Sequence, residues 1–423
     1  MTGVPLFRTL PGLPVLILVL FTSPLFGQAK DPFFSNISFD RWLSGKGESH
    51  MRWSARLGPP RLSNYQRLIA PVYLVVDGGE IAKRRGQGHL YVLVEVRDGK
   101  GAAWQNHQDY DLVKADEAVK SKSVEFGELI FVTPGDYTVW TALYVDATGE
   151  HSVLKRQLHV SALKNDPFPD AWRGLPAVEF VPESKPPESW YLPSLEGRLN
   201  LTVTTHEPVQ TELLVNLTPS GRLAASTRAQ SRALEVLIPA AKVISQINWG
   251  RTPFGLTFLD LPKQRVIYQQ DDAQRIDWSR AGDSLNEVKA GTIDAKALEH
   301  RHLSADFFVG EVRWLVTKAR GKGTPVLIIM SGAIHFDDSQ ELVPIRNDGS
   351  INPKIFYIRY QPIRELILGR GGGTTRPAMR TGDPIPDQLE PLLRPLEPRL
   401  FEVSTQPEVR RALATILSEI SKL

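Results

Sequence analysis

The amino-acid sequence predicts a chain of several domains, in which an all-β sandwich is followed by an α/β domain with a doubly wound sheet. The first observation is length, because 423 residues exceed what one ordinary domain holds. The second is the recurrence of apolar residues at every second position within residues 62–165, which is typical of half-buried strands. The third is that residues 198–423 alternate short apolar runs with segments of helical period, as α/β folds do.

The amino-terminal segment has the layout of a secretory signal peptide. Arg8 precedes an apolar run from Leu13 to Phe21, and the small residues Gly27 and Ala29 suit a signal peptidase. We therefore expect cleavage of residues 1–29 near Ala29 and a secreted or periplasmic mature protein. No later stretch approaches the roughly 20 apolar residues that a transmembrane helix requires, so we expect no membrane span.

Composition and charge narrow the classes of partner. The chain has no cysteine, so its stability must come from burial and not from disulfides. Its formal net charge is +3, from 50 Lys and Arg against 47 Asp and Glu, without a concentrated basic face. Sequence-independent phosphate binding needs such a face, so we expect no nucleic-acid partner. A bacterial envelope or exported protein fits these properties best.

Residues 30–61 form an aromatic-rich lead-in to the first domain. Phe33, Phe34, Phe39 and Trp42 recur with some helical spacing before the turn at Gly58-Pro59-Pro60. Two interpretations remain open at this point. The segment packs onto the next domain, or it is an arm that docks a partner.

Residues 62–165 carry the signature of a β-sandwich. Leu90, Val92, Val94 and Val96 share one face of a strand, and further runs cover residues 69–76, 138–145 and 153–160. Tyr137 opens a late strand after a Pro-Gly turn. This arrangement resembles the tyrosine corner of immunoglobulin-like sandwiches, and the resemblance implies that fold for the first domain.

Residues 166–197 are rich in proline and tryptophan, and they predict an ordered, semi-extended connector that contains the domain boundary. After it, Leu199–Thr205 is expected to be an edge strand. The remaining strands are expected at residues 213–217, 255–260, 265–269, 325–330, 354–360 and 400–403. Helices are expected at residues 231–247, 296–320, 387–396 and 407–423.

The most informative stretch runs from Thr211 to Arg222, where a buried strand stops in a polar turn. Asn216, Thr218 and Ser220 present oxygen-bearing side chains at alternate positions there. In a doubly wound sheet, a site lies at the carboxyl ends of the strands, so these side chains are candidates for one.

This pattern resembles the Asp-x-Ser-x-Ser loop of von Willebrand factor type A domains, which holds a divalent cation with one carboxylate and two hydroxyls. The arrangement of the chain is most similar to secreted acidobacterial proteins related to that family. The resemblance implies a Rossmann-like α/β domain over residues 198–423 and a family of adhesion and assembly modules. It places the cation-binding positions at Asn216, Thr218, Ser220, Thr292 and Ser331.

Both carboxylates of the family pattern are absent, because asparagine stands at position 216 and serine at position 331. Neutral oxygens alone make a weak site for a hard divalent cation, so we expect no metal and no cofactor. Three interpretations remain open. Asn216 and Thr218 only cap a helix or close the turn; the five positions form a metal-free binding surface; or Asp337 or Asp338 rescues a weak metal site.

The sequence therefore predicts an exported, non-enzymatic protein-binding or assembly protein with an unidentified protein partner. One alternative is a hydrolase that uses Ser331 as nucleophile and His335 as base, although no Gly-x-Ser-x-Gly elbow is present. Another alternative is an envelope spacer without any site. A carboxylate pair, a metal cluster or a nucleophilic triad is not evident in the sequence.

Overall fold

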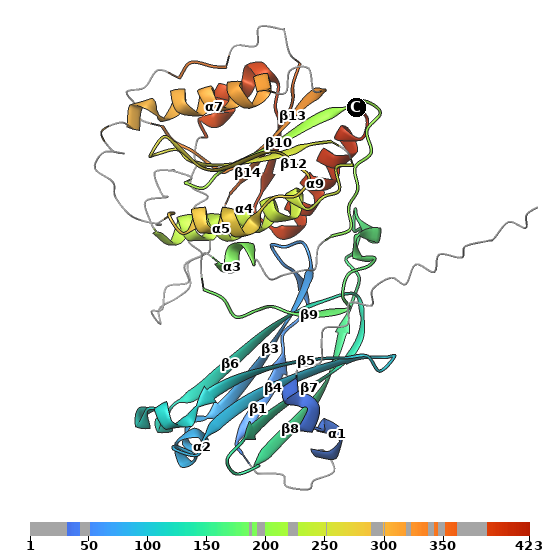
Figure 1. Ribbon diagram of the computed structural model, residues 1–423, viewed down its shortest axis with the longest axis vertical. Helices are drawn as coiled ribbons and strands as arrows, with labels where there is room; N and C mark the ends of the chain where they lie inside the picture. Colours follow the sequence, from blue (N-terminus) through green and yellow to red (C-terminus); the bar gives the residue numbers. More distant parts are fainter. Residues whose placement is uncertain are drawn as a thin grey trace, which may run out of the picture.

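The computed structural model describes residues 32–42, 51–185, 188–192, 199–218, 227–250, 252–288, 299, 301–318, 323–336, 342–345, 352–361 and 387–423. Two antiparallel sheets make up one half of the molecule, and a six-stranded sheet with helices on both faces makes up the other (Figure 1). This arrangement confirms the expectation of a β-rich, multidomain chain with several sheets.

The first antiparallel sheet has the order β1-β3-β6-β9, with β2 also paired to β3. Its strands are β1 (Trp53–Leu57), β2 (Arg61–Leu62), β3 (Leu68–Asp77), β6 (Ser123–Val132) and β9 (Val178–Phe180). The second sheet has the order β5-β4-β7-β8. Its strands are β4 (His89–Asp98), β5 (Ala103–Asp111), β7 (Gly135–Val145) and β8 (His151–Val160).

The two sheets bury one shared core between them. Val72 and Leu74 of β3 meet Val92 and Val94 of β4 in the same apolar cluster. Alternate residues of each strand face this cluster, because successive side chains of a strand point to opposite faces. The phenolic hydroxyl of Tyr137 donates to the carbonyl oxygen of Thr133 at 3.0 Å and so fixes the start of β7.

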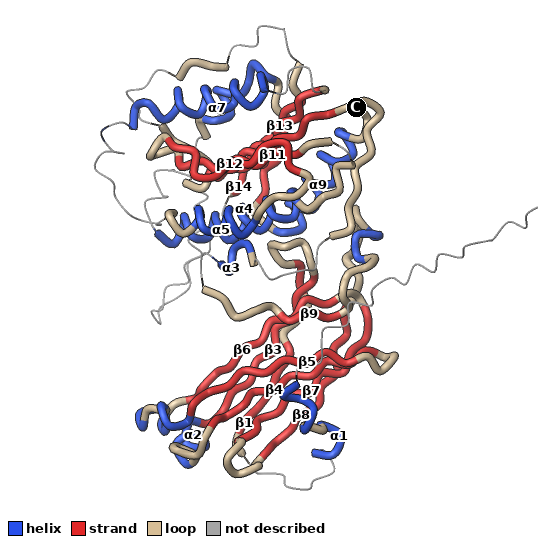
Figure 2. The backbone as a smooth tube through the Cα atoms, in the orientation of Figure 1, coloured by secondary structure: helices blue, strands red, loops and turns tan. Residues whose placement is uncertain are grey.

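The amino-terminal residues pack on the outer face of the second sheet. The 3₁₀ helix η1 (Pro32–Asn36) and the helix α1 (Phe39–Trp42) place Phe34 and Phe39 in a cluster with Leu93 and Trp140. Figure 2 shows the short helix α1 lying against the strands of this half. This part of the lead-in therefore packs onto the following domain.

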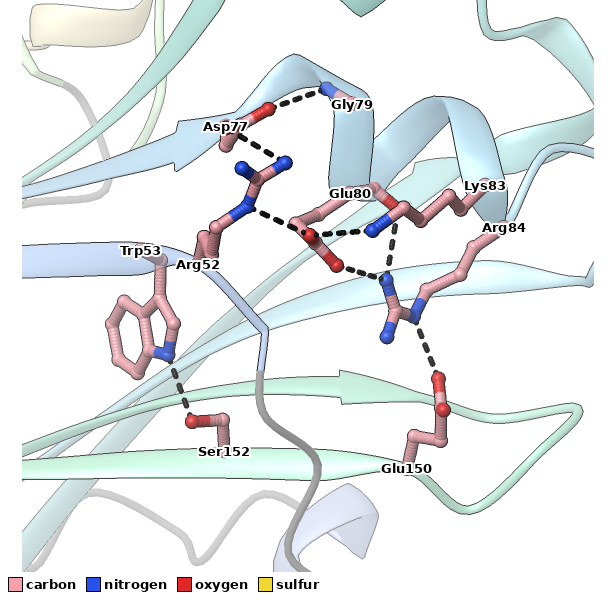
Figure 3. A network of polar contacts seen from close by, with 9 residues as sticks. All are labelled: Arg52, Trp53, Asp77, Gly79, Glu80, Lys83, Arg84, Glu150 and Ser152. Atoms are coloured by element: carbon pink, nitrogen blue, oxygen red, sulfur yellow. Dashed lines mark hydrogen bonds and ion pairs between the residues drawn. The ribbon is translucent and has the colours of Figure 1, made fainter.

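A network of ion pairs centred on Glu80 joins the two antiparallel sheets (Figure 3). Glu80 lies on α2 (Gly78–Lys83), directly after β3, and accepts hydrogen bonds from Arg52 at 3.1 Å, Lys83 at 3.0 Å and Arg84 at 2.9 Å. Arg84 also donates to Glu150 of the β7–β8 turn at 2.6 Å. The 3₁₀ helices η2 (Leu112–Lys114) and η3 (Glu117–Ser121) follow β5 at the same end.

The third sheet has the order β12-β11-β10-β13-β14-β15. Its strands are β10 (Val209–Asn216), β11 (Phe254–Asp260), β12 (Arg265–Ala273), β13 (Thr324–Gly332), β14 (Lys354–Tyr360) and β15 (Arg399–Val403). Neighbouring strands are parallel except that β12 is antiparallel to β11. β10, β11 and β13 are buried over almost their whole length, as strands covered on both faces must be.

Helices cover both faces of this sheet. One face packs against α4 (Thr227–Ser245), α5 (Trp278–Leu285) and α9 (Gln406–Ile420). The other face packs against α7 (Ser304–Lys318), which follows η5 (Arg301–Leu303), and against α8 (Leu389–Leu393), which leads into η6 (Arg394–Leu396). Figure 1 shows α7 on one side of the strands and α4, α5 and α9 on the opposite side.

A buried arginine links the two halves of the molecule. Arg410 of α9 is 2 % exposed, and its guanidinium donates to Asp166 at 2.7 and 3.0 Å and to the carbonyl oxygen of Gln66 at 3.2 Å. Asn64, in the same β2–β3 turn, accepts from the side chain of Gln406 at 2.8 Å. The turn between β2 and β3 thereby docks on the helices of the six-stranded sheet.

The connector between the halves is ordered where the structure describes it. It contains η4 (Pro169–Trp172), β9 and α3 (Glu188–Tyr191). β9 lies inside the range expected to be a connector, and β1 lies upstream of the expected start of the sandwich at residue 62. β1 has the sequence Trp-Ser-Ala-Arg-Leu, in which a single position is buried, so the hydrophobic pattern was too weak to predict it.

The prediction of an edge strand at Leu199–Thr205 is wrong. This segment forms one isolated bridge, from Thr202 to Asn248, and pairs with the turn after α4 and not with the sheet. The N–H of Val203 donates to the carbonyl oxygen of Asn248, and the N–H of Asn248 donates to that of Leu201. The apolar residues of this segment are buried against α4. Their alternation in the sequence therefore did not show whether the segment belongs to the sheet.

Candidate functional site

The candidate site lies at the carboxyl ends of β10 and β13, the two central strands of the six-stranded sheet. β10 is followed by α4 on one face of the sheet, whereas Ile334 and Phe336, which follow β13, pack in the cluster with α7 and α8 on the other face. Loops that leave neighbouring parallel strands towards opposite faces leave a crevice between them. The residues that end the two strands therefore line the position where a ligand would sit in a sheet of this kind.

Asn216 and Ser331 meet at this position. Val215 of β10 pairs with Met330 of β13. The residues that follow them, Asn216 and Ser331, are in contact through their side chains. The Nδ2 of Asn216 donates to the Oγ of Ser331 at 3.0 Å, and the Ser331 hydroxyl donates to the carbonyl oxygen of Gly332 at 2.7 Å. Asn216 is 1 % exposed and Ser331 is 0 % exposed. Neither group is open to solvent.

Thr218 completes the same network. Its N–H and its hydroxyl both donate to the Oδ1 of Asn216, at 3.1 and 3.3 Å, which makes the turn that follows β10. The Thr218 hydroxyl oxygen also accepts from the N–H of Leu261 at 3.0 Å. The amide of Asn216 thus joins the ends of β10 and β13, and Thr218 ties the turn to the end of β11.

The remaining positions of the expected site lie outside the described residues. These are Ser220, Thr292, Asp337 and Asp338. Within the described part of the chain, no group of three His, Cys, Asp or Glu side chains could hold a metal ion. The described donors and acceptors of Asn216, Thr218 and Ser331 already satisfy one another.

The network continues along the sheet into charged residues that the sequence interpretation missed. Ser331 pairs in register with Arg359 of β14, and Arg359 pairs with Glu402 of β15. Arg359 is buried and donates to Asp387 at 3.3 Å, to Glu390 at 3.1 Å and to Glu402. An arginine within the apolar run of residues 354–360 was the signal that could have indicated this cluster.

Asp387 is the acceptor around which this cluster is built. It accepts from the N–H of Ile334 at 3.1 Å and from the hydroxyl of Tyr357 at 2.9 Å, in addition to Arg359. Burial, together with the charge of Asp387, raises the pKa of Tyr357 well above its ordinary value. The phenol therefore stays neutral and donates a hydrogen bond to Asp387 at any physiological pH.

The geometry of Ser331 does not favour its use as a nucleophile. Its proton is directed to the carbonyl oxygen of Gly332, whereas an activated serine directs its proton to a base. The side chain is also fully buried, and the half-buried His335 follows it on the loop after β13. Chemically, this arrangement closes the edge of the sheet with neutral hydrogen bonds.

Comparisons with known proteins give little further information. No protein-family model matches the chain, and no curated protein matches it. Among solved structures, the chain is similar to the ApaA protein from Bordetella pertussis with a TM-score of 0.17 and 7 % sequence identity. That similarity covers 27 % of this chain and 97 % of the ApaA chain. Within the described residues, no helix is long and apolar enough to cross a membrane.

Proposed function

We propose that the protein is an exported protein-binding or assembly protein without catalytic activity, and that it binds its partner without a metal ion. In this proposal residues 198–423 form a von Willebrand factor A-like domain, and the antiparallel half is an immunoglobulin-like sandwich. The observation that carries the proposal is the hydrogen bond between Asn216 and Ser331, where related domains hold two carboxylates.

The order of the strands supports the assignment of the α/β domain. Numbered in chain order from β10, the six strands of the sheet read 3-2-1-4-5-6. That is the order of doubly wound sheets, whose ligands bind where the order reverses between strands 1 and 4. Strands 1 and 4 here are β10 and β13, which end in Asn216 and Ser331–Gly332.

The antiparallel half has two features that support an immunoglobulin-like sandwich. Its two sheets pack face to face over a common core, and Tyr137 hydrogen-bonds backwards to Thr133 in the manner of a tyrosine corner. In such proteins a sandwich spaces or presents another domain. The ion pair between Arg410 and Asp166 gives it a fixed attachment to α9.

Metal-independent binding follows from the chemistry of the network. A hard divalent cation needs anionic oxygens to compensate for its lost water, and Asn216, Thr218 and Ser331 offer only neutral ones. These oxygens also accept hydrogen bonds that a cation would have to displace. We expect the partner to contact the loops that bear Asn216, Thr218, Ser220, Thr292 and Ser331 through direct hydrogen bonds.

Partner capture with a matched control tests this function. The mature protein is immobilised and exposed to an envelope extract, with and without EDTA, together with the Thr218→Ala and Thr317→Ala variants. Thr317 is an exposed threonine on α7, close to the amino ends of the strands. We expect the same captured protein with and without EDTA, less of it with Thr218→Ala, and no change with Thr317→Ala.

Three results would count against the proposal. Capture that disappears in EDTA would show that a metal mediates binding. Labelling of the wild-type protein by a serine-directed fluorophosphonate, lost in Ser331→Ala, would favour a hydrolase. A surface that shows neither label nor partner would favour a spacer.

A further inference from the structure

A groove with a volume of about 1000 Å³ lies where the sandwich meets the helices of the six-stranded sheet. Its walls come from β5 and β6 on one side and from the β2–β3 turn, the segment after β9, α3 and α4 on the other. None of its lining residues belongs to the network of Asn216, Thr218 and Ser331. An inference about this groove is therefore independent of the function proposed for the loops above the sheet.

Negative charge dominates the lining of the groove. The basic side chains that line it are Arg61 and His107. The carboxylates that line it are Asp109, Glu125, Glu128, Glu183 and Glu235. A wall of this composition attracts cations and repels phosphate groups, so it fits neither a nucleic acid nor an anionic membrane surface.

Glu128 is the most buried of these carboxylates. It is 5 % exposed, and the amide of Gln108 donates to its Oε2 at 3.0 Å. Among the described residues, no lysine, arginine or histidine contributes to the pKa of this carboxylate. Burial raises its pKa to about 7, hydrogen bonds from Asn106 and Gln108 oppose this rise, and the charge of Glu183 adds to it.

The contrast with Glu80 shows what Glu128 lacks. Glu80 is equally buried, but three basic side chains surround it within 3.1 Å (Figure 3). A buried carboxylate without a cation costs several kcal/mol unless its charge is compensated. A positively charged side chain from outside would compensate Glu128 in the way that Arg84 compensates Glu80.

Aromatic side chains and an unused donor complete the groove. Tyr110 and Phe126 lie with their ring centroids 4.6 Å apart at its wall, and Tyr65 and Phe131 line it as well. Aromatic faces next to carboxylates attract guanidinium and ammonium groups. Trp190 also lines the groove, is 7 % exposed, and has no acceptor for its indole N–H within the described part of the protein.

Two strand edges border the groove. β5 is the last strand of its sheet. β9 covers β6 from Ile130 to Val132, and the N–H of Val181 also donates to the carbonyl oxygen of Leu129. The side chain of Gln108 donates to the carbonyl oxygen of Gly127 on the uncovered part of β6. Main-chain groups at an uncovered strand edge bind extended peptide segments, whereas a small amine could not use them.

We propose that this groove binds an extended basic segment of a partner protein, and that an arginine or lysine side chain of the segment pairs with Glu128. The volume exceeds that of a single side chain, and the strand edges can bind the backbone of such a segment. The carboxylates at the rim strengthen the attraction for further basic residues.

Calorimetric titration at pH 8 tests the proposal with a short blocked peptide of alternating arginine and threonine residues. We expect the wild-type protein to bind it and the Glu128→Gln variant to bind it at least about tenfold more weakly, because a charge-assisted pair is lost. Glutamine keeps the shape of the side chain and removes a costly buried charge, so this variant should fold.

Glu95→Gln is the matched control. Glu95 is 3 % exposed on β4 and also accepts a hydrogen bond from a glutamine of β5, Gln105, but it does not line the groove. We expect its affinity for the peptide to equal that of the wild type. Thr218→Ala should also leave this affinity unchanged, which separates a failure here from a failure of the function proposed for the sheet edge.

Several results would overturn the proposal. They are no binding by the wild-type protein, equal binding by wild type and Glu128→Gln, and equal binding of a peptide in which glutamate replaces arginine. Spermidine that binds as tightly as the peptide would show a small-amine site in place of a peptide groove.

Discussion

Asn216 and Ser331 are joined by a hydrogen bond of 3.0 Å across the carboxyl ends of β10 and β13. Both side chains are buried, and the Oδ1 of Asn216 also accepts from the N–H and the hydroxyl of Thr218. One amide thus satisfies polar groups on two elements. The contact joins the carboxyl ends of the two central strands with neutral hydrogen bonds.

Asn216→Ala should destabilise the protein by about 1–3 kcal/mol. The substitution leaves the N–H of Thr218 without its acceptor and removes the donor to Ser331, and unpaired buried polar groups cost free energy of that size. Urea unfolding measures the change. Asn200→Ala, at an exposed asparagine, is the control and should change the free energy of unfolding by less than about 0.5 kcal/mol. An equally small effect at Asn216 would contradict the role assigned to the network.

The double variant Asn216→Asp with Ser331→Asp should create a metal site. Two carboxylates would face each other within hydrogen-bond reach, so without metal the melting temperature should fall because of their repulsion. Added Mg²⁺ or Mn²⁺ should restore it, because an ion that binds only the folded state stabilises that state. A melting temperature of the double variant that does not respond to either ion would refute the proposed equivalence to the metal-binding loops.

The sequence predicted the central strands of this sheet well and its surroundings less well. β13 was predicted because Val326–Met330 is a continuous apolar run of the length that a buried parallel strand has. β5 was not individually predicted, because Gln105, His107 and Asp109 interrupt any apolar alternation on its outer face. Phe33 of η1 packs against His107 of β5, and the local sequence pattern does not carry such information.

Local pattern also limited the prediction of the candidate site. The ends of neighbouring parallel strands meet at one edge of a sheet, so the proximity of Asn216 and Ser331 followed from the two strands. Asp387 reaches Arg359 from 28 residues further along the chain, and no spacing rule links them. The groove beside Glu128 depends on how the sandwich docks on α4 and α9, which is a tertiary property.

The Glu80 network predicts a loss of stability in acid. Burial raises the pKa of Glu80, but hydrogen bonds from Arg84, Lys83 and Arg52 outweigh burial and lower the pKa from 4.5 to about 2. A lowered pKa stabilises the folded state above pH 4.5, and this contribution is lost as the pH falls through about 2. Glu80→Gln should therefore cost on the order of 2 kcal/mol at pH 7 and almost nothing near pH 2.

Urea unfolding of Glu80→Gln across this range of pH measures the difference. Glu117→Gln is the control, because Glu117 is 82 % exposed and its pair with Arg85 is long, at 3.6 Å. We expect this control to follow the wild type within about 0.5 kcal/mol at every pH. A cost of Glu80→Gln that does not depend on pH would exclude titration of Glu80 as its cause.

Glu128 predicts the opposite dependence. Its pKa is raised by burial from 4.5 to about 7, so the folded protein holds a proton that the unfolded chain releases between those values. Stability contributed by this group therefore falls as the pH rises from 4.5 to 7. Glu128→Gln should be about 2–3 kcal/mol more stable than the wild type above pH 7 and equal to it below pH 4.5. Equal stability of the two proteins at pH 8 would show that the carboxylate is not desolvated.

The most direct test of whether the edge of the sheet is closed without a metal ion is the melting temperature of the unmutated protein in EDTA and in millimolar Mg²⁺ or Mn²⁺. A site whose dissociation constant lies far above the millimolar range contributes almost nothing to stability at millimolar ion. Closure without a metal ion predicts the same melting temperature under all three conditions. A rise in melting temperature with Mg²⁺ or Mn²⁺ that is abolished in Asn216→Ala or Thr218→Ala would contradict it.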